Sequence, residues 1–255
     1  MAEIIDGKKV AGQIKEELKH EIEGFKHNGL GEPGLAVVLI GDDPASESYV
    51  AMKHKDCLQV GINSIEHKYG SDFGEDKLLA LVEELNNDPA VSGMIVQLPL
   101  PKGYDENKVI NAILPEKDVD CFHPVNIGKM VIGDEDGFFP CTPYGCQHLI
   151  AETVKDLKGK HLVVVGRSNI VGKPMANLMI QKNERANCVV TVCHSAAPDL
   201  SVYTKEADIL VVATGKAGLV TGDMVKDGVV VIDVGSNMVE KGDGKRGFVG
   251  DVVFD

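Results

Sequence analysis

Apolar segments and helix-like segments alternate along this whole chain, and that alternation restricts its fold more than any other feature of the sequence. A continuous apolar run is typical of a strand that is covered on both faces, and strands separated by helices build βαβ units. Such runs are LAVVLIG (35–41), GMIVQLPL (93–100), HLVVVG (161–166), DILVVAT (208–214) and GVVVIDVG (228–235). The sequence therefore predicts an α/β protein with mostly parallel sheets.

The order of the segments predicts two α/β domains with a cleft between them, the second of them Rossmann-like. The first half predicts helices over 4–27, 46–60 and 75–87 and strands over 35–41, 62–70 and 93–100. The second half predicts helices over 143–154 and 173–181 and strands over 161–166, 188–193, 208–214 and 228–235. A stretch rich in Pro and Gly (120–145) shows little periodicity and separates the halves. We therefore expect domains at 1–120 and 140–255, joined by 121–139.

Composition argues against two classes of partner. The 255 residues include 39 acidic and 26 basic side chains, which gives a formal charge of −13. Nucleic acid is an unsuitable partner for such a chain, because phosphate backbones are held by clustered Lys and Arg. A membrane is not expected either, since no segment reaches the roughly 20 apolar residues of a membrane helix.

The cysteines and the first residues predict a cytoplasmic protein with reduced thiols. The first twenty residues are charged throughout and do not resemble a secretory signal. Cys141/Cys146 and Cys188/Cys193 have C-x4-C spacing, but neither pair has a neighbouring C-x2-C or a His at the usual zinc spacing. We expect buried structural cysteines and no metal site.

The clearest local motif is VVVGRSNIVGKP (163–174), an apolar run that leads through a turn with Gly166 and Gly172 into a helix. Glycines let the backbone approach a pyrophosphate, and a helix N-terminus offers unpaired N–H donors. The spacing is G-x5-G rather than G-x-G-x-x-G, so a simple tight connection in an α/β domain is the alternative.

The residues around this motif favour NADP over NAD. An Asp or Glu at the end of the second strand would bind the ribose 2′-hydroxyl of NAD, whereas an Arg accommodates the 2′-phosphate of NADP. The second strand here ends in Cys193-His194-Ser195, without a carboxylate, and Arg167 lies in the turn. A solvated loop charge is the alternative interpretation of Arg167.

Candidate substrate residues lie in the first half. Tyr49 and Lys53 are four residues apart on a predicted helix that begins near Ser46 and Ser48, so both side chains lie on one face. Gln97 interrupts an apolar run, and a buried amide needs hydrogen-bond partners. Asp118 and Asp120 precede the junction. For each group a purely structural role is the alternative: an amphipathic helix, a structural glutamine and turn-forming aspartates.

The chain resembles the bifunctional methylenetetrahydrofolate dehydrogenase/cyclohydrolase family over nearly all of its 255 residues. The resemblance lies in motifs that follow one another in the family's order: IGDDPASESYVAMK, NNDPAVSGMIVQLPLP, PEKDVD, PCTPYG and VVVGRSNIVGKP. It implies a folate domain and an NADP domain that face each other across a cleft, and a homodimer. It also implies oxidation of 5,10-methylenetetrahydrofolate with NADP and hydrolysis of the methenyl product to 10-formyltetrahydrofolate, within one-carbon metabolism and purine biosynthesis.

The resemblance also implies residue roles at matching positions. Lys53 is expected to be the catalytic amine, Gln97 its positioning partner, Tyr49 a stacking ring and Asp120 a hydrogen-bond partner of the pterin. The NADP site is expected at the turn and at the end of the second strand: Gly166, Arg167, Ser168, Ile170, Gly172 and Ser195.

Three departures from the family pattern leave alternatives open. The sequence stops at GDVVFD (250–255), where the family continues with a Pro-Gly-Gly-Val-Gly-Pro-Met-Thr segment and a helix. Cys121 stands where Gly is usual, and Ala197 where Thr is common. One alternative is a catalytically impaired protein that binds folate or nucleotide. The other is a different two-domain NADP dehydrogenase, of the shikimate or amino-acid type.

Overall fold

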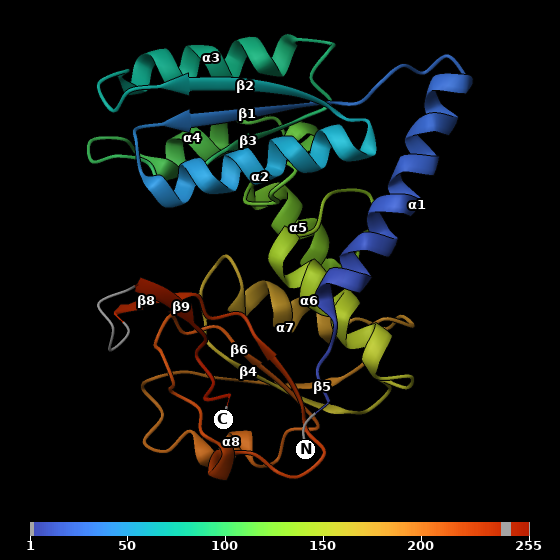
Figure 1. The fold of residues 1–255 in the computed structure, drawn as a ribbon, viewed down its shortest axis with the longest axis vertical. Coiled ribbons are helices and arrows are strands. Elements are labelled where there is room, and N and C mark those ends of the chain that lie inside the picture. Colours follow the sequence, from blue (N-terminus) through green and yellow to red (C-terminus); the bar gives the residue numbers. More distant parts are fainter. Residues whose placement is uncertain (1–2, 241–245, 255) are drawn as a thin grey trace. The chain divides into compact units, whose positions relative to one another are not determined.

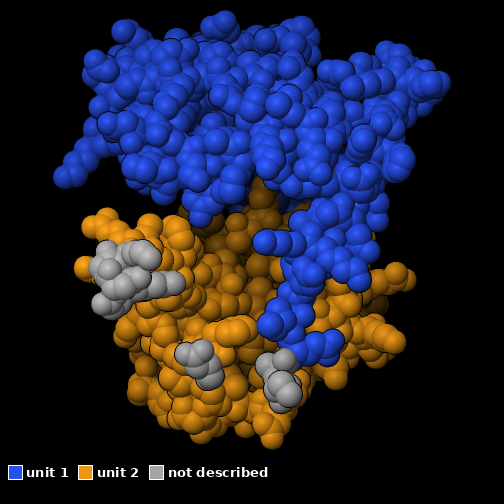
Figure 2. Space-filling view, in the orientation of Figure 1, with its two compact units in different colours: residues 1–129, 135–139 blue, residues 130–134, 140–255 orange. Residues whose placement is uncertain are grey.

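The chain divides into two compact units, which Figure 2 colours separately, and each unit is built around its own sheet (Figure 1). This computed structural model describes residues 3–240 and 246–254. Unit 1 contains Met1–Lys129 and Glu135–Phe139, and unit 2 contains Met130–Asp134 and Pro140–Asp255. The prediction of an α/β protein with mostly parallel sheets is confirmed, since every strand pair within the two larger sheets is parallel.

Unit 1 has a parallel sheet of order β2-β1-β3, formed by Asn63–Tyr69, Gly34–Ile40 and Gly93–Val96. Side chains of β1 alternate between two apolar layers. Ala36, Val38 and Ile40 belong to the larger core cluster, together with the buried leucines and Val82 of α3 (Glu75–Asn87). Val37 and Leu39 instead pack with Val50 of α2 (Pro44–Val60). Helices therefore cover both faces of β1, as its continuous apolar run predicts.

The start of α2 differs from the prediction. The N-cap is Asp43, whose carboxylate accepts a 2.8 Å hydrogen bond from the Ser46 N–H, and Pro44 occupies the first turn. Proline suits that position because its fixed φ matches the helix and its missing N–H would have no partner there. Ser46 and Ser48 therefore lie inside α2. Gly61 ends the helix at a φ of 90°, in the left-handed region that glycine adopts at low cost.

Other elements of unit 1 are shorter or were not predicted. Strand β3 ends at Val96 instead of residue 100, because Pro99 and Pro101 have no N–H to donate to a ladder. The long α1 is Gly7–His27, close to its predicted range. The helices α4 (Glu106–Ala112) and α5 (Pro124–Ile132) and the 3-10 turn Pro115–Lys117 were missed, and α5 lies in the stretch that shows little periodicity.

Unit 2 has a parallel sheet of order β5-β4-β6-β7, formed by Val189–Cys193, His161–Val165, Ile209–Val212 and Val230–Asp233. Its helices are α6 (Cys141–Thr153), α7 (Gly172–Met179) and the short α8 (Ser201–Thr204), with a 3-10 turn at Gly222–Met224. The first strand of the unit, β4, lies inside the sheet with its successors on either side. That order is the Rossmann-like pattern, and it confirms the predicted fold class.

A two-stranded antiparallel ribbon completes unit 2 and was not predicted. It pairs β8 (Asn237–Glu240) with β9 (Arg246–Val249), and Met238 stands opposite Phe248. Among the helices of residues 3–240 and 246–254, none combines the length and the apolar character that crossing a membrane requires.

Candidate active site

In unit 1 the structure joins two predicted site residues directly. Lys53, half-buried on α2, donates a 3.1 Å hydrogen bond from Nζ to Oε1 of Gln97, the first residue after β3. The Gln97 amide nitrogen donates to the Leu98 carbonyl at 2.8 Å. The Gln97 backbone N–H donates to the Val38 carbonyl of β1 at 2.9 Å. The Gln97 backbone is thus anchored to β1, and its side-chain amide is held by Leu98, with the amide oxygen turned toward the Lys53 amine.

Tyr49 lies one helical turn before Lys53 on the continuous α2, and its side chain is 48% exposed. Positions four apart on a helix share a face, so the ring and the amine face the same side. An exposed aromatic ring beside an amine can stack on a planar ligand.

The two aspartates before the junction have different environments. Asp118 is only 2% exposed, and its carboxylate accepts hydrogen bonds from the His123 N–H and from Nδ2 of Asn126, both at 2.9 Å. Asp118 therefore holds the turn that leads into α5. Asp120 is half-buried, and both aspartates line a narrow, largely apolar cavity together with Leu98 and Phe122. The turn-forming interpretation fits the buried Asp118, whereas Asp120 is the more exposed of the two aspartates in this cavity.

Cys121, next to Asp120, has a φ of 56° and no exposed surface. This is the left-handed region, where a Cβ atom crowds the following carbonyl and costs roughly 1–2 kcal/mol. Cys121, which stands where the family usually has Gly, therefore has a strained backbone.

In unit 2 the two glycines of the G-x5-G turn allow a close backbone approach. A Cβ on Gly172 would lie 2.4 Å from the Gly166 carbonyl oxygen, and a Cβ on Gly166 would lie 2.3 Å from the Ala213 carbonyl oxygen. Gly166 also has a φ of 138°. The turn therefore brings the end of β4, the start of α7 and the exit of β6 together, which is where a Rossmann-like sheet receives a pyrophosphate.

Ser168 organises the same turn. Its hydroxyl accepts hydrogen bonds from the N–H groups of Val171 at 3.0 Å and Gly172 at 3.3 Å. A hydroxyl that accepts from the chain still has its own proton to donate. Ile170, between these residues, is 47% exposed and is accessible to a ligand at the turn.

Arg167 and the end of β5 meet at the same edge. Arg167 Nη1 lies 3.2 Å from Nε2 of His194, the residue before the exposed Ser195. Within residues 3–240 and 246–254, no carboxylate lies within ion-pair distance of Arg167. Its remaining guanidinium donors can therefore serve an anion. Together with the glycine turn, these residues fit a dinucleotide that carries a 2′-phosphate.

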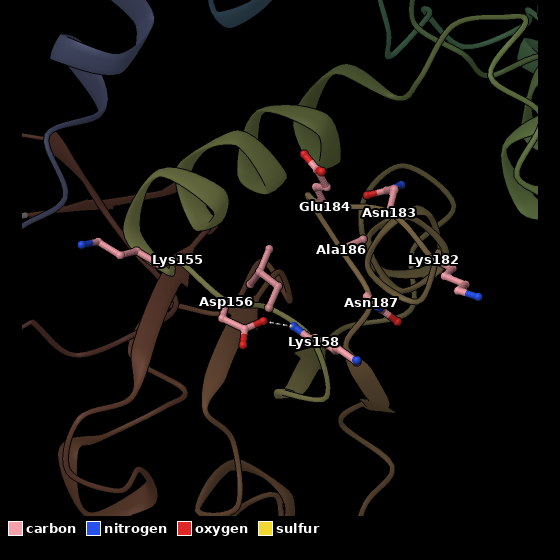
Figure 3. Close-up of a pocket in the computed structure, with 9 residues that line it drawn as sticks. Lys155, Asp156, Lys158, Lys182, Asn183, Glu184, Ala186 and Asn187 are labelled. Atoms are coloured by element: carbon pink, nitrogen blue, oxygen red, sulfur yellow. Dashed lines mark hydrogen bonds between the residues drawn. The ribbon is translucent and has the colours of Figure 1, made fainter.

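A larger depression of unit 2, about 560 Å³, lies away from this edge. It is lined by segments that precede β4 and β5, among them Lys155, Lys158 and Lys182, so it lies at the amino ends of the strands. Figure 3 shows that Lys155 and Lys182 point away from each other. Ligands of open α/β sheets bind beyond the carboxyl ends, so this depression is not the candidate site.

Two residues at the carboxyl edge were missed by the sequence analysis. Thr214 follows β6, and Asp251 accepts a hydrogen bond from its backbone N–H at 2.6 Å. The position of Thr214 at the end of the apolar run 208–214 was a usable signal, because the carboxyl ends of parallel strands meet at one edge. No short-range pattern points to Asp251, which is 37 residues away from Thr214 in the chain.

Of the four cysteines in C-x4-C pairs, Cys146, Cys188 and Cys193 are buried as expected, but Cys141 is exposed, so the expectation is wrong for Cys141. Burial raises the pKa of Cys146, Cys188 and Cys193 to about 11, so these thiols stay protonated at neutral pH. Within the described part of the chain, no group of three or more His, Cys, Asp or Glu side chains is arranged to hold a metal ion.

The chain matches one family over both units. The family description "Tetrahydrofolate dehydrogenase/cyclohydrolase, catalytic domain" matches residues 5–120, and "Tetrahydrofolate dehydrogenase/cyclohydrolase, NAD(P)-binding domain" matches residues 140–255. The bifunctional protein FolD of Chloroherpeton thalassium is 51% identical over 255 residues, which cover 99% of this chain and 87% of that protein.

Solved structures agree with these matches. The bifunctional enzyme FolD-methylenetetrahydrofolate dehydrogenase/cyclohydrolase from Campylobacter jejuni is 44% identical, with a TM-score of 0.90 over 98% of this chain and 86% of that one. The Trypanosoma brucei enzyme, solved with NADP and an inhibitor, is 36% identical, with a TM-score of 0.91 over 100% of this chain and 86% of that one. These matches favour the folate enzymes over another two-domain NADP dehydrogenase. The chain belongs to the tetrahydrofolate dehydrogenase/cyclohydrolase family.

Proposed function

We propose that this chain performs both reactions of its family through two sets of residues, one in each unit. The dehydrogenase oxidises 5,10-methylenetetrahydrofolate with NADP, and the cyclohydrolase converts the methenyl product to 10-formyltetrahydrofolate. The observation that carries the proposal is the Lys53–Gln97 hydrogen bond in the unit that matches the family's catalytic domain. A lysine held in place by an amide can transfer protons at a fixed point.

The hydrolysis requires such a proton carrier. Water adds to the methenyl carbon and loses one proton, which leaves a hydroxyl group on that carbon. The bond from the carbon to N5 then breaks, N5 takes up a proton, and the hydroxyl proton is lost as the formyl C=O forms. The balance is the methenyl cation plus water, giving 10-formyltetrahydrofolate and one released proton. We assign the proton transfers to the Lys53 amine and its orientation to Gln97, since positioned acid–base groups contribute about 10²–10⁴-fold to such rates.

Tyr49 and Asp120 are proposed to hold the folate. The exposed ring of Tyr49 would stack on the planar part of the substrate, on the same helix face as Lys53. Asp120 would accept hydrogen bonds from pterin N–H groups, supported by its place in the cavity that Leu98 also lines. A carboxylate is a pure acceptor and suits neighbouring N–H donors.

The turn after β4 is proposed to hold NADP, which accepts the hydride when bound. Gly166 and Gly172 would admit the pyrophosphate, and Ser168 and Ile170 would line the turn. Arg167 and Ser195 would contact the 2′-phosphate and the adenosine end, supported by the contact between Arg167 and His194.

Domains, assembly and location are proposed on narrower grounds. We propose a folate domain at 1–120, a junction at 121–139 and an NADP domain at 140–255. A homodimer formed through the NADP domain would cover the ribbon residues Met238 and Phe248, which are 56% and 63% exposed. Buried thiols in unit 2 favour a reducing compartment, the cytoplasm. No nucleic acid or membrane partner is proposed, and the 10-formyl product would serve purine biosynthesis.

One assay tests the proposal. The 255-residue chain is supplied with 5,10-methylenetetrahydrofolate and either NADP or NAD, and methenyltetrahydrofolate formation is followed. Turnover with a preference for NADP is expected. A demonstrably folded chain that is silent with both cofactors would overturn the proposal in favour of a binding protein, and a preference for NAD would overturn the assignment of Arg167.

A further inference from the structure

A buried carboxylate outside the predicted site ties together the edge where NADP is proposed to bind. Asp251 has no exposed surface. Its Oδ2 accepts hydrogen bonds from the Thr214 N–H at 2.6 Å, the Thr214 hydroxyl at 2.9 Å and the Gly215 N–H at 3.0 Å. Its Oδ1 accepts from Nδ2 of Asn237 at 2.8 Å. One carboxylate thus connects the exit of β6 with the start of β8.

The exit of β6 lies against the glycine turn. The Ala213 N–H donates to the Val165 carbonyl of β4 at 2.9 Å, and the Ala213 carbonyl oxygen is the atom that a Cβ on Gly166 would approach within 2.3 Å. The residues that Asp251 holds, Thr214 and Gly215, follow directly. Thr214 and Gly215 therefore lie beside the turn that is proposed to receive the pyrophosphate, and their position determines the shape of the site there.

The segment that carries Asp251 is itself fixed. Asp233, at the end of β7, accepts from the N–H groups of Asp251 and Val252, both at 3.0 Å. A Cβ on Gly235 would lie 2.3 Å from the Asp251 carboxyl carbon, and one on Gly250 would lie 1.8 Å from Asp233 Oδ2. This close packing fixes the orientation of the Asp251 carboxylate.

The contacts suit an ionised carboxylate. Within residues 3–240 and 246–254, no Lys or Arg lies within ion-pair distance of Asp251, so neutral donors alone compensate for its burial. Removal of the side chain would leave the N–H groups of Thr214 and Gly215 without this acceptor. A buried donor without an acceptor is unfavourable, so these two residues would move away from their present position.

We infer that Asp251 is a positioning residue for NADP, acting by holding Thr214 and Gly215 against the turn at Gly166. The inference rests on the proposed cofactor edge. Because the cyclohydrolase reaction uses no NADP, the effect of Asp251 belongs to cofactor affinity and to the dehydrogenase.

The test compares Asp251→Ala and Asp251→Asn with Asp208→Asn. Asp208 is a matched control in the same unit, because its carboxylate accepts from the His161 N–H at 2.9 Å and from Lys226 Nζ at 2.7 Å, at the amino ends of the strands. NADP affinity is measured by titration calorimetry and the melting temperature by circular dichroism. Cyclohydrolase activity is measured in the absence of NADP.

We expect Asp251→Ala to weaken NADP binding about tenfold, or ~1.4 kcal/mol. Asp251→Asn, which keeps one acceptor oxygen, should weaken it less. Cyclohydrolase activity in both should stay within about twofold of wild type, an effect below ~0.5 kcal/mol. Asp208→Asn should lower the melting temperature without this loss of affinity.

Three results would overturn the inference. The first is NADP affinity that stays at the wild-type value in both Asp251 variants. The second is an affinity loss that follows the melting temperature equally in the Asp208 and Asp251 variants, which would make Asp251 merely structural. The third is a folded wild-type chain that binds no NADP, which would refute the proposed cofactor site itself and is distinguishable because it appears before any substitution. If Asp251→Ala does not fold, the NADP affinity of Asp251→Asn alone tests the inference.

Discussion

Lys53 Nζ donates a 3.1 Å hydrogen bond to Gln97 Oε1, although the two residues are 44 positions apart in the chain. Parallel pairing produces this contact. Val96 stands opposite Val38 of β1, so Gln97 emerges at the carboxyl end of the sheet, near the helix that follows β1. An amide oxygen accepts from either protonation state of an amine, so it can orient Lys53 while the amine takes up and releases a proton.

Replacement of Lys53 by Met is expected to lower cyclohydrolase activity by about 100-fold or more, because the positioned proton carrier is lost. NADP affinity should stay unchanged, since Lys53 lies in unit 1 and the glycine turn in unit 2. The measurement is methenyltetrahydrofolate hydrolysis together with NADP calorimetry. Lys55→Met is the control, an exposed lysine two residues further along α2 and therefore on another face. Full hydrolysis by Lys53→Met would refute its assigned role.

Replacement of Gln97 by Glu is expected to move the pH–rate profile of hydrolysis to higher pH. A carboxylate about 3 Å from the Lys53 amine favours its protonated form, so more alkaline solution is needed to remove the proton. Gln97→Leu removes the acceptor without adding charge, and should lower the rate without that displacement. A profile that stays in place in Gln97→Glu would show that Lys53 does not carry the proton.

Much of the fold was predictable because the apolar runs are long and uninterrupted. The strand at 161–166 and the helix at 75–87 match β4 and α3 within one residue. The misses have local causes. Helices α4 and α8 are short, and the ribbon strands β8 and β9 have only 4 residues each. Helix α5 was missed because it lies in a stretch rich in Gly and Pro, which are typical of loops.

The candidate site was predictable where its residues lie together in one sequence motif, and less so where contacting residues are far apart in the sequence. The turn from Gly166 to Gly172 is a single motif, and its glycines are required by backbone contacts below 3 Å. Asp118 and Asp120 are two positions apart, and only the packing of the folded chain makes the first buried and the second half-buried. Asp251 depends on a contact across 37 residues, which no local pattern reveals.

Cys121 offers a test of backbone strain. Its φ of 56° is costly for any residue with a Cβ atom, so Cys121→Gly should be more stable than Cys121→Ala by about 1 kcal/mol. Both variants lose the same buried thiol, which makes the alanine variant the matched reference. Urea unfolding monitored by circular dichroism gives the difference. An alanine variant as stable as the glycine variant would contradict the strain at this position.

Asp251 should also affect stability in acid. Burial by itself raises the pKa of this carboxyl group, but hydrogen bonds from Asn237, Thr214 and Gly215 outweigh it and hold the pKa below its usual value. A carboxylate with a depressed folded-state pKa contributes stability that is present above about pH 4 and is lost as the pH falls through the folded-state value. The urea midpoint of wild type should therefore exceed that of Asp251→Asn at neutral pH, and the gap should narrow below about pH 4. A difference between the two urea midpoints that does not change with pH would contradict an ionised Asp251 carboxylate.

Arg167 should determine the choice between NADP and NAD. Hydrogen bonds to a charged group contribute about 1.5–3 kcal/mol, so Arg167→Ala should raise the KM for NADP by about 10- to 100-fold. The KM for NAD should change much less, because NAD has no 2′-phosphate. Arg167→Lys keeps the charge but loses the guanidinium fork, and should lie between wild type and alanine.

Arg185 supplies the control for this experiment. It makes a similar contact, with Nη1 3.3 Å from Nε2 of His148, but it lies between α7 and β5, away from the carboxyl ends of the strands. Arg185→Ala removes one positive charge from the same unit, so it measures the effect of net charge on the binding of an anionic cofactor. If Arg167→Ala and Arg185→Ala raise the KM for NADP equally, the effect is general electrostatics. A rise confined to Arg167→Ala, with the NAD value unchanged, would place the 2′-phosphate at the guanidinium beside His194.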